Sequence, residues 1–315
     1  MRFRLLTVSL ALSVCLAASA AAQFQEGDPK GPKLGDSRVQ RWRAGMIITA
    51  GGACKGLEGW TPFPVDWPEQ EVRVVEEEIS PSAKVSYQMV DGTVKMMRVR
   101  IPFLPPGTVA NAIVTFEIKR SVQLPPENTD IYVLPDVRKL DRMIRVYLAP
   151  SPYIDSRHAT IRSQAKRITA DVDKAWDQVE AIYDWVRENV EYKDGPLKGA
   201  LAAMRDGTGD CEELTSLFIA LCRASNIPAR TVWVPGHCYP EFYLEDDEGG
   251  GHWFPCQAAG SRAFGGIPEQ RPILQKGDNF RPPYNTRERQ RYLAEHLTGA
   301  GGRPSVRFVR ELVSE

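Results

Sequence analysis

The spacing of hydrophobic residues changes along the chain from a period of two to a period of 3.6. Between residues 39 and 124, apolar and polar positions alternate, as in the runs 85–89 and 114–118. Such alternation is typical of half-buried strands, and Asp91 with Gly92 supplies a short turn between two antiparallel strands. This region therefore predicts an antiparallel, β-sandwich-like domain.

Beyond residue 156, the apolar residues recur every three or four positions. This spacing predicts amphipathic helices over 161–168 and 176–190, and a third that begins at Cys211. Three strand-like runs follow, at 230–234, 237–244 and 251–256. Helices followed by antiparallel strands predict an α+β domain after the β-rich one.

Stretches rich in proline, glycine and charge divide these patterns. The last of them precedes a helix expected near 286–297. The expected organisation is a signal peptide (1–22), a mobile leader (23–38), a β-rich domain (39–124), a linker (125–155), an α+β domain (156–262) and a C-terminal loop and helix extension (263–315).

The first 22 residues have the layout of a secretory signal. Arg2 and Arg4 precede an apolar run over 5–18, and alanines occupy 20–22 before Gln23. Lipidation of Cys15 is disfavoured because branched Val14 stands where such sites take a small residue. No later apolar run reaches the roughly 20 residues of a membrane span, so we expect an exported, periplasmic or extracellular protein without membrane insertion after signal removal.

The charges of the chain balance, with 40 basic and 40 acidic residues. A neutral chain exerts no general attraction on nucleic acid, so no nucleic-acid partner is expected. The composition carries no signal of the oligomeric state.

Cys211 stands at the first position of its expected helix. Asp210 precedes it as a helix cap, and Glu212 and Glu213 favour the positive end of the helix dipole. The same partial positive charge favours a thiolate at Cys211 and makes its sulfur a candidate nucleophile. Of the four histidines, His237 is the best candidate base, because it opens an apolar strand directly after Gly236.

Four short motifs in this order resemble the transglutaminase-like superfamily. They are Gly209-Asp210-Cys211 opening a helix, the run 221–230, Gly236-His237 on a strand, and Trp253-Phe254-Pro255 on the next strand. The resemblance covers about 156–260 and makes 156–262 the expected transglutaminase-like domain. It implies a papain-like α+β core, in which a helix delivers the cysteine to an antiparallel sheet that carries the histidine and a third polar residue.

Residue by residue, the resemblance implies that Cys211 is the nucleophile and His237 the base. The third position usually holds an aspartate in the family, and Gln257 stands there in this chain. A glutamine oxygen accepts the imidazole N–H but offers no charge to stabilise the imidazolium. We therefore expect catalytic residues Cys211, His237 and Gln257 with weaker activation.

A hairpin that places His237 opposite Gln257 also places Cys238 opposite Cys256. This register predicts a contact or disulfide between Cys238 and Cys256; the alternative is two buried reduced thiols. Trp233 and Tyr239 flank the expected cleft, either shaping an acyl-binding groove or serving only as packing residues.

The implied chemistry is acyl transfer through a Cys211 thioester. Attack on a peptide bond or a glutamine side chain leads to hydrolysis or to transamidation with an amine, and the substrate is expected to be a protein or peptide. This chemistry needs no cofactor, and no spacing of ligands suits a metal. Because Gln257 replaces the usual acid, the alternative is a catalytically degenerate domain that binds protein or peptide as a scaffold.

Overall fold

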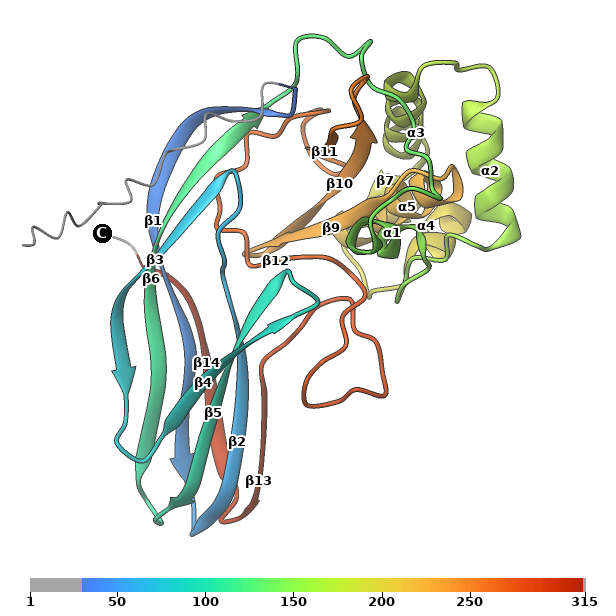
Figure 1. The fold of residues 1–315 in the computed structure, drawn as a ribbon. Helices are drawn as coiled ribbons and strands as arrows, with labels where there is room; N and C mark the ends of the chain where they lie inside the picture. Colours follow the sequence, from blue (N-terminus) through green and yellow to red (C-terminus); the bar gives the residue numbers. More distant parts are fainter. Residues whose placement is uncertain (1–29, 314–315) are drawn as a thin grey trace, which may run out of the picture.

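The computed structural model describes residues 30–313 of the 315-residue chain. The expected signal peptide and residues 23–29 of the expected leader lie outside the described residues. Figure 1 shows two parts side by side, a long β-sandwich and a mixed part in which helices cover one face of a smaller sheet. The fold is α+β and mostly antiparallel, as the sequence predicts.

The sandwich consists of two four-stranded antiparallel sheets. The first has the order β14 (Pro304–Val313), β1 (Lys33–Ala50), β6 (Val109–Leu124) and β3 (Gln70–Ile79). The second has the order β13 (His296–Gly301), β2 (Cys54–Phe63), β5 (Val94–Leu104) and β4 (Lys84–Val90).

Alternation of side chains builds the core between the two sheets. On β1, Ala44, Met46 and Ile48 are buried and point inward, because successive strand residues face opposite sides. Asp91 and Gly92 have φ angles of 47° and 73°, and they turn the chain between β4 and β5. The predicted hairpin is thus confirmed, although its loop has three residues, 91–93, and not two, because Val90 pairs with Val94.

Both ends of the described chain depart from the sequence-based expectation. Residues 33–38, expected in a mobile leader, are part of β1 and pair with β6, for example Lys33 with Leu124. Backbone hydrogen bonds to β6 hold them, and backbone pairing leaves little trace in a polar composition.

The helix expected over 286–297 is wrong. Residues 286–295 contain no helix, and β13 and β14 follow them to complete both sheets of the sandwich. Leu297 and Phe308 pack against the sandwich core. In a separate C-terminal extension, these two side chains would lack that contact. The expected extension therefore returns to the β-rich part, and burial against distant strands overrides local helix propensity.

The mixed part contains the predicted helices and strands. Its main helices are α2 (Ala159–Thr169), α3 (Ala175–Asn189), α4 (Ala200–Asp206) and α5 (Cys211–Ala224). Its sheet has the order β11 (Gly251–Pro255), β10 (His237–Glu245), β9 (Ala229–Val234) and β12 (Gln275–Lys276). Strands β7 (Glu191–Tyr192) and β8 (Thr208–Gly209) form a short parallel pair before α5.

Helix α5 is the centre of this part. Leu217 and Phe218 on α5 are fully buried in a common core with Phe242, Leu244 and Phe254 of the sheet. Helix α5 therefore has neighbours on almost every side, and its position relative to β10 is fixed by packing.

The segment 125–155, expected as a linker, is itself packed. It contains α1 (Arg142–Arg145) and a 3₁₀ turn at Val146–Leu148, and its residues Tyr132 and Ile154 belong to the core around α5. None of the helices within 30–313 is long and apolar enough to cross a membrane.

Buried polar contacts join the sandwich to the free face of the small sheet. The Gln70 side chain donates to the carbonyl of Ile273 at 3.0 Å and accepts from its N–H at 2.6 Å. Arg120 donates to the hydroxyl of Tyr239 at 3.2 Å. These buried bonds fix how the two parts meet, because breaking one leaves a polar group unsatisfied.

Candidate active site

Cys211 is the first residue of α5, as predicted. The Asp210 carboxylate accepts the N–H of Glu212 at 2.7 Å, and Glu213 accepts the N–H of Asp210 at 3.3 Å, which completes a capping box. The caps hold the helix start rigid. The thiol of Cys211 is half-buried and faces a cleft.

The structure brings the three expected site residues together. His237 hydrogen-bonds to Cys211, and its Nε2 lies 3.2 Å from Oε1 of Gln257. With Nε2 engaged by an amide oxygen, Nδ1 is the ring nitrogen left for the sulfur. The imidazole is thus held between a thiol and an amide acceptor.

The strand register that joins these residues differs from the predicted one. Glu241 pairs with Pro255, and Cys256 donates its N–H to the carbonyl of Pro240. Gln257 is therefore a diagonal neighbour of His237 rather than its direct partner, and diagonal side chains on one face remain within reach of each other.

The expected disulfide between Cys238 and Cys256 is wrong, and the alternative of two buried reduced thiols is confirmed. Cys256 is buried in the core around α5 and its backbone forms an isolated β-bridge with Phe264. Cys238 lies against Cys211 instead. All five cysteines of the described residues are free thiols. The observed register removes the direct pairing of Cys238 with Cys256, and β11 ends at Pro255.

The surroundings of Cys211 favour its thiolate. A hydrogen bond from the Cys238 thiol, then one from His237 and one from the Cys238 backbone N–H, lower the pKa of Cys211 to about 4 against the opposing effect of burial. The helix start adds a partial positive charge at the same point.

His237 is shifted in the opposite sense. Burial alone lowers its pKa, but the hydrogen bonds to Cys211 and Gln257 outweigh burial, so the pKa of His237 lies above its usual 6.5. The two groups stabilise each other's charged forms, and the pair favours thiolate and imidazolium.

Cys238 is a site residue whose position the sequence did not reveal. Its Sγ lies 3.6 Å from the carbonyl oxygen of Cys211, and its own carbonyl accepts the hydroxyl of Thr215 at 3.5 Å. Burial, followed by the bond to Cys211, raises the pKa of Cys238 well above its usual value. Cys238 therefore remains a neutral thiol that donates to its neighbour.

A cleft of about 560 Å³ opens in front of Cys211 and His237. Both parts of the molecule line it: Trp42 and Arg310 come from the sandwich, and Arg291 and Tyr292 from the C-terminal loop. Sequence analysis missed these four residues, because only tertiary packing places them beside Cys211.

Trp233 lines the cleft, whereas Tyr239 does not. Tyr292 packs edge-on against the Trp233 ring at 5.3 Å, and the Arg291 guanidinium lies 5.1 Å from that ring. Arg291 also forms an ion pair with Glu212 of α5. Tyr239 is fully buried in a separate apolar cluster with Val232 and Ile273, so only its alternative role as a packing residue applies.

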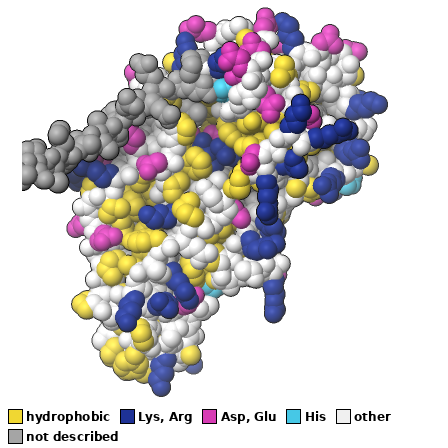
Figure 2. Space-filling view, in the orientation of Figure 1, with side chains coloured by type: hydrophobic (Ala, Val, Ile, Leu, Met, Phe, Trp, Pro, Cys, Tyr) yellow, Lys and Arg dark blue, Asp and Glu magenta, His cyan; other side chains and the backbone are white. Residues whose placement is uncertain are grey.

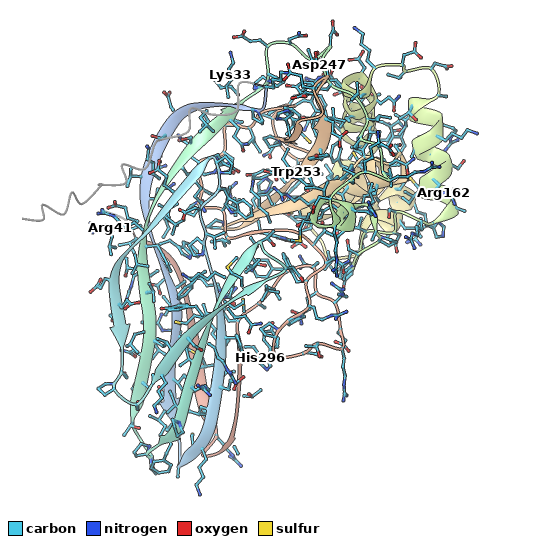
Figure 3. The ribbon with its side chains drawn as sticks, in the orientation of Figure 1. Lys33, Arg41, Arg162, Asp247, Trp253 and His296 are labelled. Atoms are coloured by element: carbon cyan, nitrogen blue, oxygen red, sulfur yellow. The ribbon has the colours of Figure 1, made fainter. Side chains whose placement is uncertain are left out.

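A second polar cluster lies on the sandwich side of the same sheet. Lys276 binds Glu241 at 2.5 Å and Glu69 at 2.6 Å, and Arg230 binds the other oxygen of Glu241 at 2.8 Å. Arg230 also lies 4.0 Å from the ring centre of Trp253, which Figure 3 places between the small sheet and the sandwich. We call these four charged residues the buried charge cluster.

The surface is unevenly charged. Figure 2 shows Lys and Arg side chains along the side that carries α2, where Arg162 and Lys166 are exposed. Hydrophobic side chains are also spread over the sandwich in Figure 2. Met89 and Phe103 are among its exposed apolar residues. Scattered apolar residues of this kind are normal on a protein surface.

Comparison with known proteins supports the fold and the family. Residues 162–258 match the family model described as "Transglutaminase-like superfamily". No curated protein sequence matches the chain significantly.

Two solved structures are similar to this one. A "Putative Cysteine Protease" from Cytophaga hutchinsonii has a TM-score of 0.58 and 19% identity over 90% of this chain and 93% of the other. The periplasmic domain of TgpA from Pseudomonas aeruginosa has a TM-score of 0.35 and 14% identity over 73% and 91% of the two chains. The Cytophaga structure supports the fold through most of the chain, and the family match spans α3, α5 and β9 to β11. The part of the chain that carries Cys211 and His237 is therefore similar to the transglutaminase-like superfamily.

Proposed function

We propose that this protein is an exported cysteine enzyme that cleaves amide or peptide bonds through a thioester on Cys211. The observation that carries the proposal is the contact of Cys211 with His237 and of His237 with Gln257 at the rim of a cleft. A pKa of about 4 for Cys211 makes the thiolate its main form at neutral pH.

In the first half-reaction, the Cys211 thiolate attacks the carbonyl carbon of the substrate. The backbone N–H of Cys211 has no partner within its helix, and it donates to the oxyanion that forms. His237 then gives its proton to the departing amine, and the thioester remains on Cys211. Gln257 orients the imidazole through Nε2 but supplies no charge.

In the second half-reaction, water or an amine attacks the thioester with His237 as base. The product acid or new amide leaves, and the Cys211 thiolate is restored. The half-exposed position of Cys211 favours hydrolysis, because water then reaches the thioester. The acyl-transfer chemistry supplied by Cys211 and His237 needs no added group, and the mixed aromatic and charged cleft suits a protein or peptide substrate.

The pH dependence of Cys211 alkylation and of turnover tests the proposal. Iodoacetamide should label Cys211 with a midpoint near pH 4, far below the midpoint of about 8.5 for a free thiol. Peptide turnover should rise as Cys211 ionises near pH 4 and fall above the raised pKa of His237, where the imidazolium that protonates the leaving amine is lost. Labelling is measured by mass spectrometry, and Cys211→Ala serves as the control that lacks the Cys211 thiol.

Product analysis separates the possible outcomes. Glutamine-containing peptides are incubated with a fluorescent primary amine, and peptide cleavage, ammonia release and amine incorporation are measured together. If the amine is incorporated and the peptide is not hydrolysed, the reaction of the enzyme is transamidation. Slow alkylation of Cys211 with an ordinary midpoint, together with no turnover, would contradict the proposal of an enzyme. The peptide-binding scaffold would then be the remaining function.

A further inference from the structure

Two thiols meet at the start of α5. The Cys238 Sγ lies 3.6 Å from the Cys211 carbonyl oxygen, and the Cys238 thiol is also within hydrogen-bonding reach of the Cys211 sulfur. A single thiol hydrogen serves one of these acceptors at a time, and either arrangement keeps the two residues in contact. The Thr215 bond to the Cys238 carbonyl holds β10 against the first turn of the helix.

The other described cysteines are placed differently. Cys54 is buried in the sandwich core, and Cys256 is buried in the core around α5. Cys222 lies eleven residues after Cys211 on the same helix, which corresponds to about 16 Å along its axis. Cys238 is therefore the described cysteine positioned to react with Cys211.

We propose that Cys211 and Cys238 form a reversible disulfide that switches the nucleophile off under oxidising conditions. The two thiols differ in access, because Cys211 faces the cleft whereas Cys238 is only 2% exposed. A disulfide from solution therefore reacts at Cys211 first, and Cys238 resolves the product within the molecule.

The exchange uses a small disulfide such as glutathione disulfide as oxidant. The Cys211 thiolate attacks one sulfur, the disulfide bond of the oxidant breaks, and one glutathione thiolate leaves. The Cys238 thiol then loses its proton and attacks the Cys211 sulfur, and the second glutathione leaves. Two protein thiols are oxidised to one disulfide, and one glutathione disulfide is reduced to two thiols.

Consumption of the Cys211 thiolate assists the second step. The charge on Cys211 is one cause of the raised pKa of Cys238, and this cause disappears when the mixed disulfide forms. Burial of Cys238 remains, so the second step is the slower one. The disulfide also shields Cys211 from irreversible oxidation to sulfinic and sulfonic acids. Loss of activity in the disulfide form rests on the proposed function, whereas formation of the bond does not.

The full mature chain, reduced and then treated with glutathione disulfide, tests the proposal by intact-protein and peptide mass spectrometry. We expect the mass to fall by two hydrogens, a crosslinked peptide pair containing Cys211 and Cys238, and reversal by dithiothreitol. Cys238→Ser, which keeps a small hydrogen-bonding side chain, should accumulate the Cys211 glutathione adduct instead. Cys256→Ala is the matched control and should behave as the unchanged protein.

Two results separate this inference from the proposed function. A stable glutathione adduct on Cys211 in the unchanged protein, without the internal disulfide, would overturn the switch while leaving the reactive nucleophile in place. A reversible Cys211–Cys238 disulfide in a protein that turns over no peptide when reduced would support the disulfide proposal. The same result would contradict the proposed enzymatic function.

Discussion

Two titratable side chains on strand β10, His237 and Glu241, lie in opposite kinds of surroundings. They are four residues apart and on the same face of the strand. His237 lies at the open end of the strand, half-buried, beside one thiol and one uncharged amide. Glu241 lies in the middle, fully buried, between Lys276 and Arg230.

The difference shows that the degree of burial and the charge of the neighbouring groups decide the role of a polar side chain. Burial works against ionisation of Glu241, but two cations keep its pKa lowered, so its charge is permanent although the side chain is fully buried. The charge of His237 depends on a proton shared with Cys211 at the edge of a cleft. The buried charge cluster thus suits the joining of sandwich to sheet, and the pair at the strand end suits chemistry.

The largest expected effect is that of His237→Ala on turnover. Loss of the general acid and base should lower kcat/KM for peptide hydrolysis by about 10²- to 10⁴-fold, because proton transfer to the leaving amine is lost. The alkylation midpoint of Cys211 should also rise, since the imidazolium no longer stabilises its thiolate. Both quantities are measured on the same preparation.

His158→Ala is the matched control for that substitution. His158 caps the start of α2 outside the cleft, and its loss should change turnover little. A His237→Ala protein that retained full turnover would contradict the contrast between the end and the middle of β10.

Glu241→Ala should give the next largest effect, on stability rather than on the thiol. Removing the carboxylate leaves Lys276 and Arg230 buried without their shared partner, which costs about 3–5 kcal/mol in the free energy of unfolding. Urea denaturation measures this loss. In the protein that remains folded, the alkylation midpoint of Cys211 should stay near pH 4.

The surface pair of Glu71 with Lys119 provides the comparison. Its atoms lie 3.1 Å apart, but both side chains are exposed, so Glu71→Ala should cost less than about 1 kcal/mol. Equal losses for the two substitutions would show that burial does not distinguish the cluster from a surface pair.

Gln257→Ala should have the smallest effect of the three. One hydrogen bond from the imidazolium to a neutral amide oxygen is worth about 1.5 kcal/mol, so turnover should fall roughly tenfold. Gln257→Glu sharpens the comparison, because it adds at the strand end a negative charge like the one at Glu241. This charge should raise the pKa of His237 further and extend the alkaline limb of the pH profile upward. An unchanged limb would mean that the residue orients the ring without electrostatic influence.

The sequence determined the local elements on which the candidate site rests. Periodicity located α3, α5 and the strands β9 to β11, and the cap at Asp210 located Cys211 at a helix start. These features depend on neighbours within a few residues, because helix caps and side-chain alternation are local interactions. For the same reason the resemblance pointed to Cys211, His237 and Gln257 from short motifs alone.

Only the tertiary structure decided what surrounds those residues. The pairing of Glu241 with Pro255 set the register, so Cys238 and Cys256 are not direct partners, and the packing of α5 on β10 placed Cys238 against Cys211. Register is selected by packing of whole faces, and several registers satisfy the same local alternation.

Long-range strand pairing decided the rest. His296 pairs with Trp60, so a segment that the sequence assigned to a helix completes the sandwich. The sandwich in turn brings Trp42 and Arg310 to the cleft in front of Cys211. Contacts between residues so far apart in the chain come from burial of shared apolar surface, which has no signature within a short stretch of sequence.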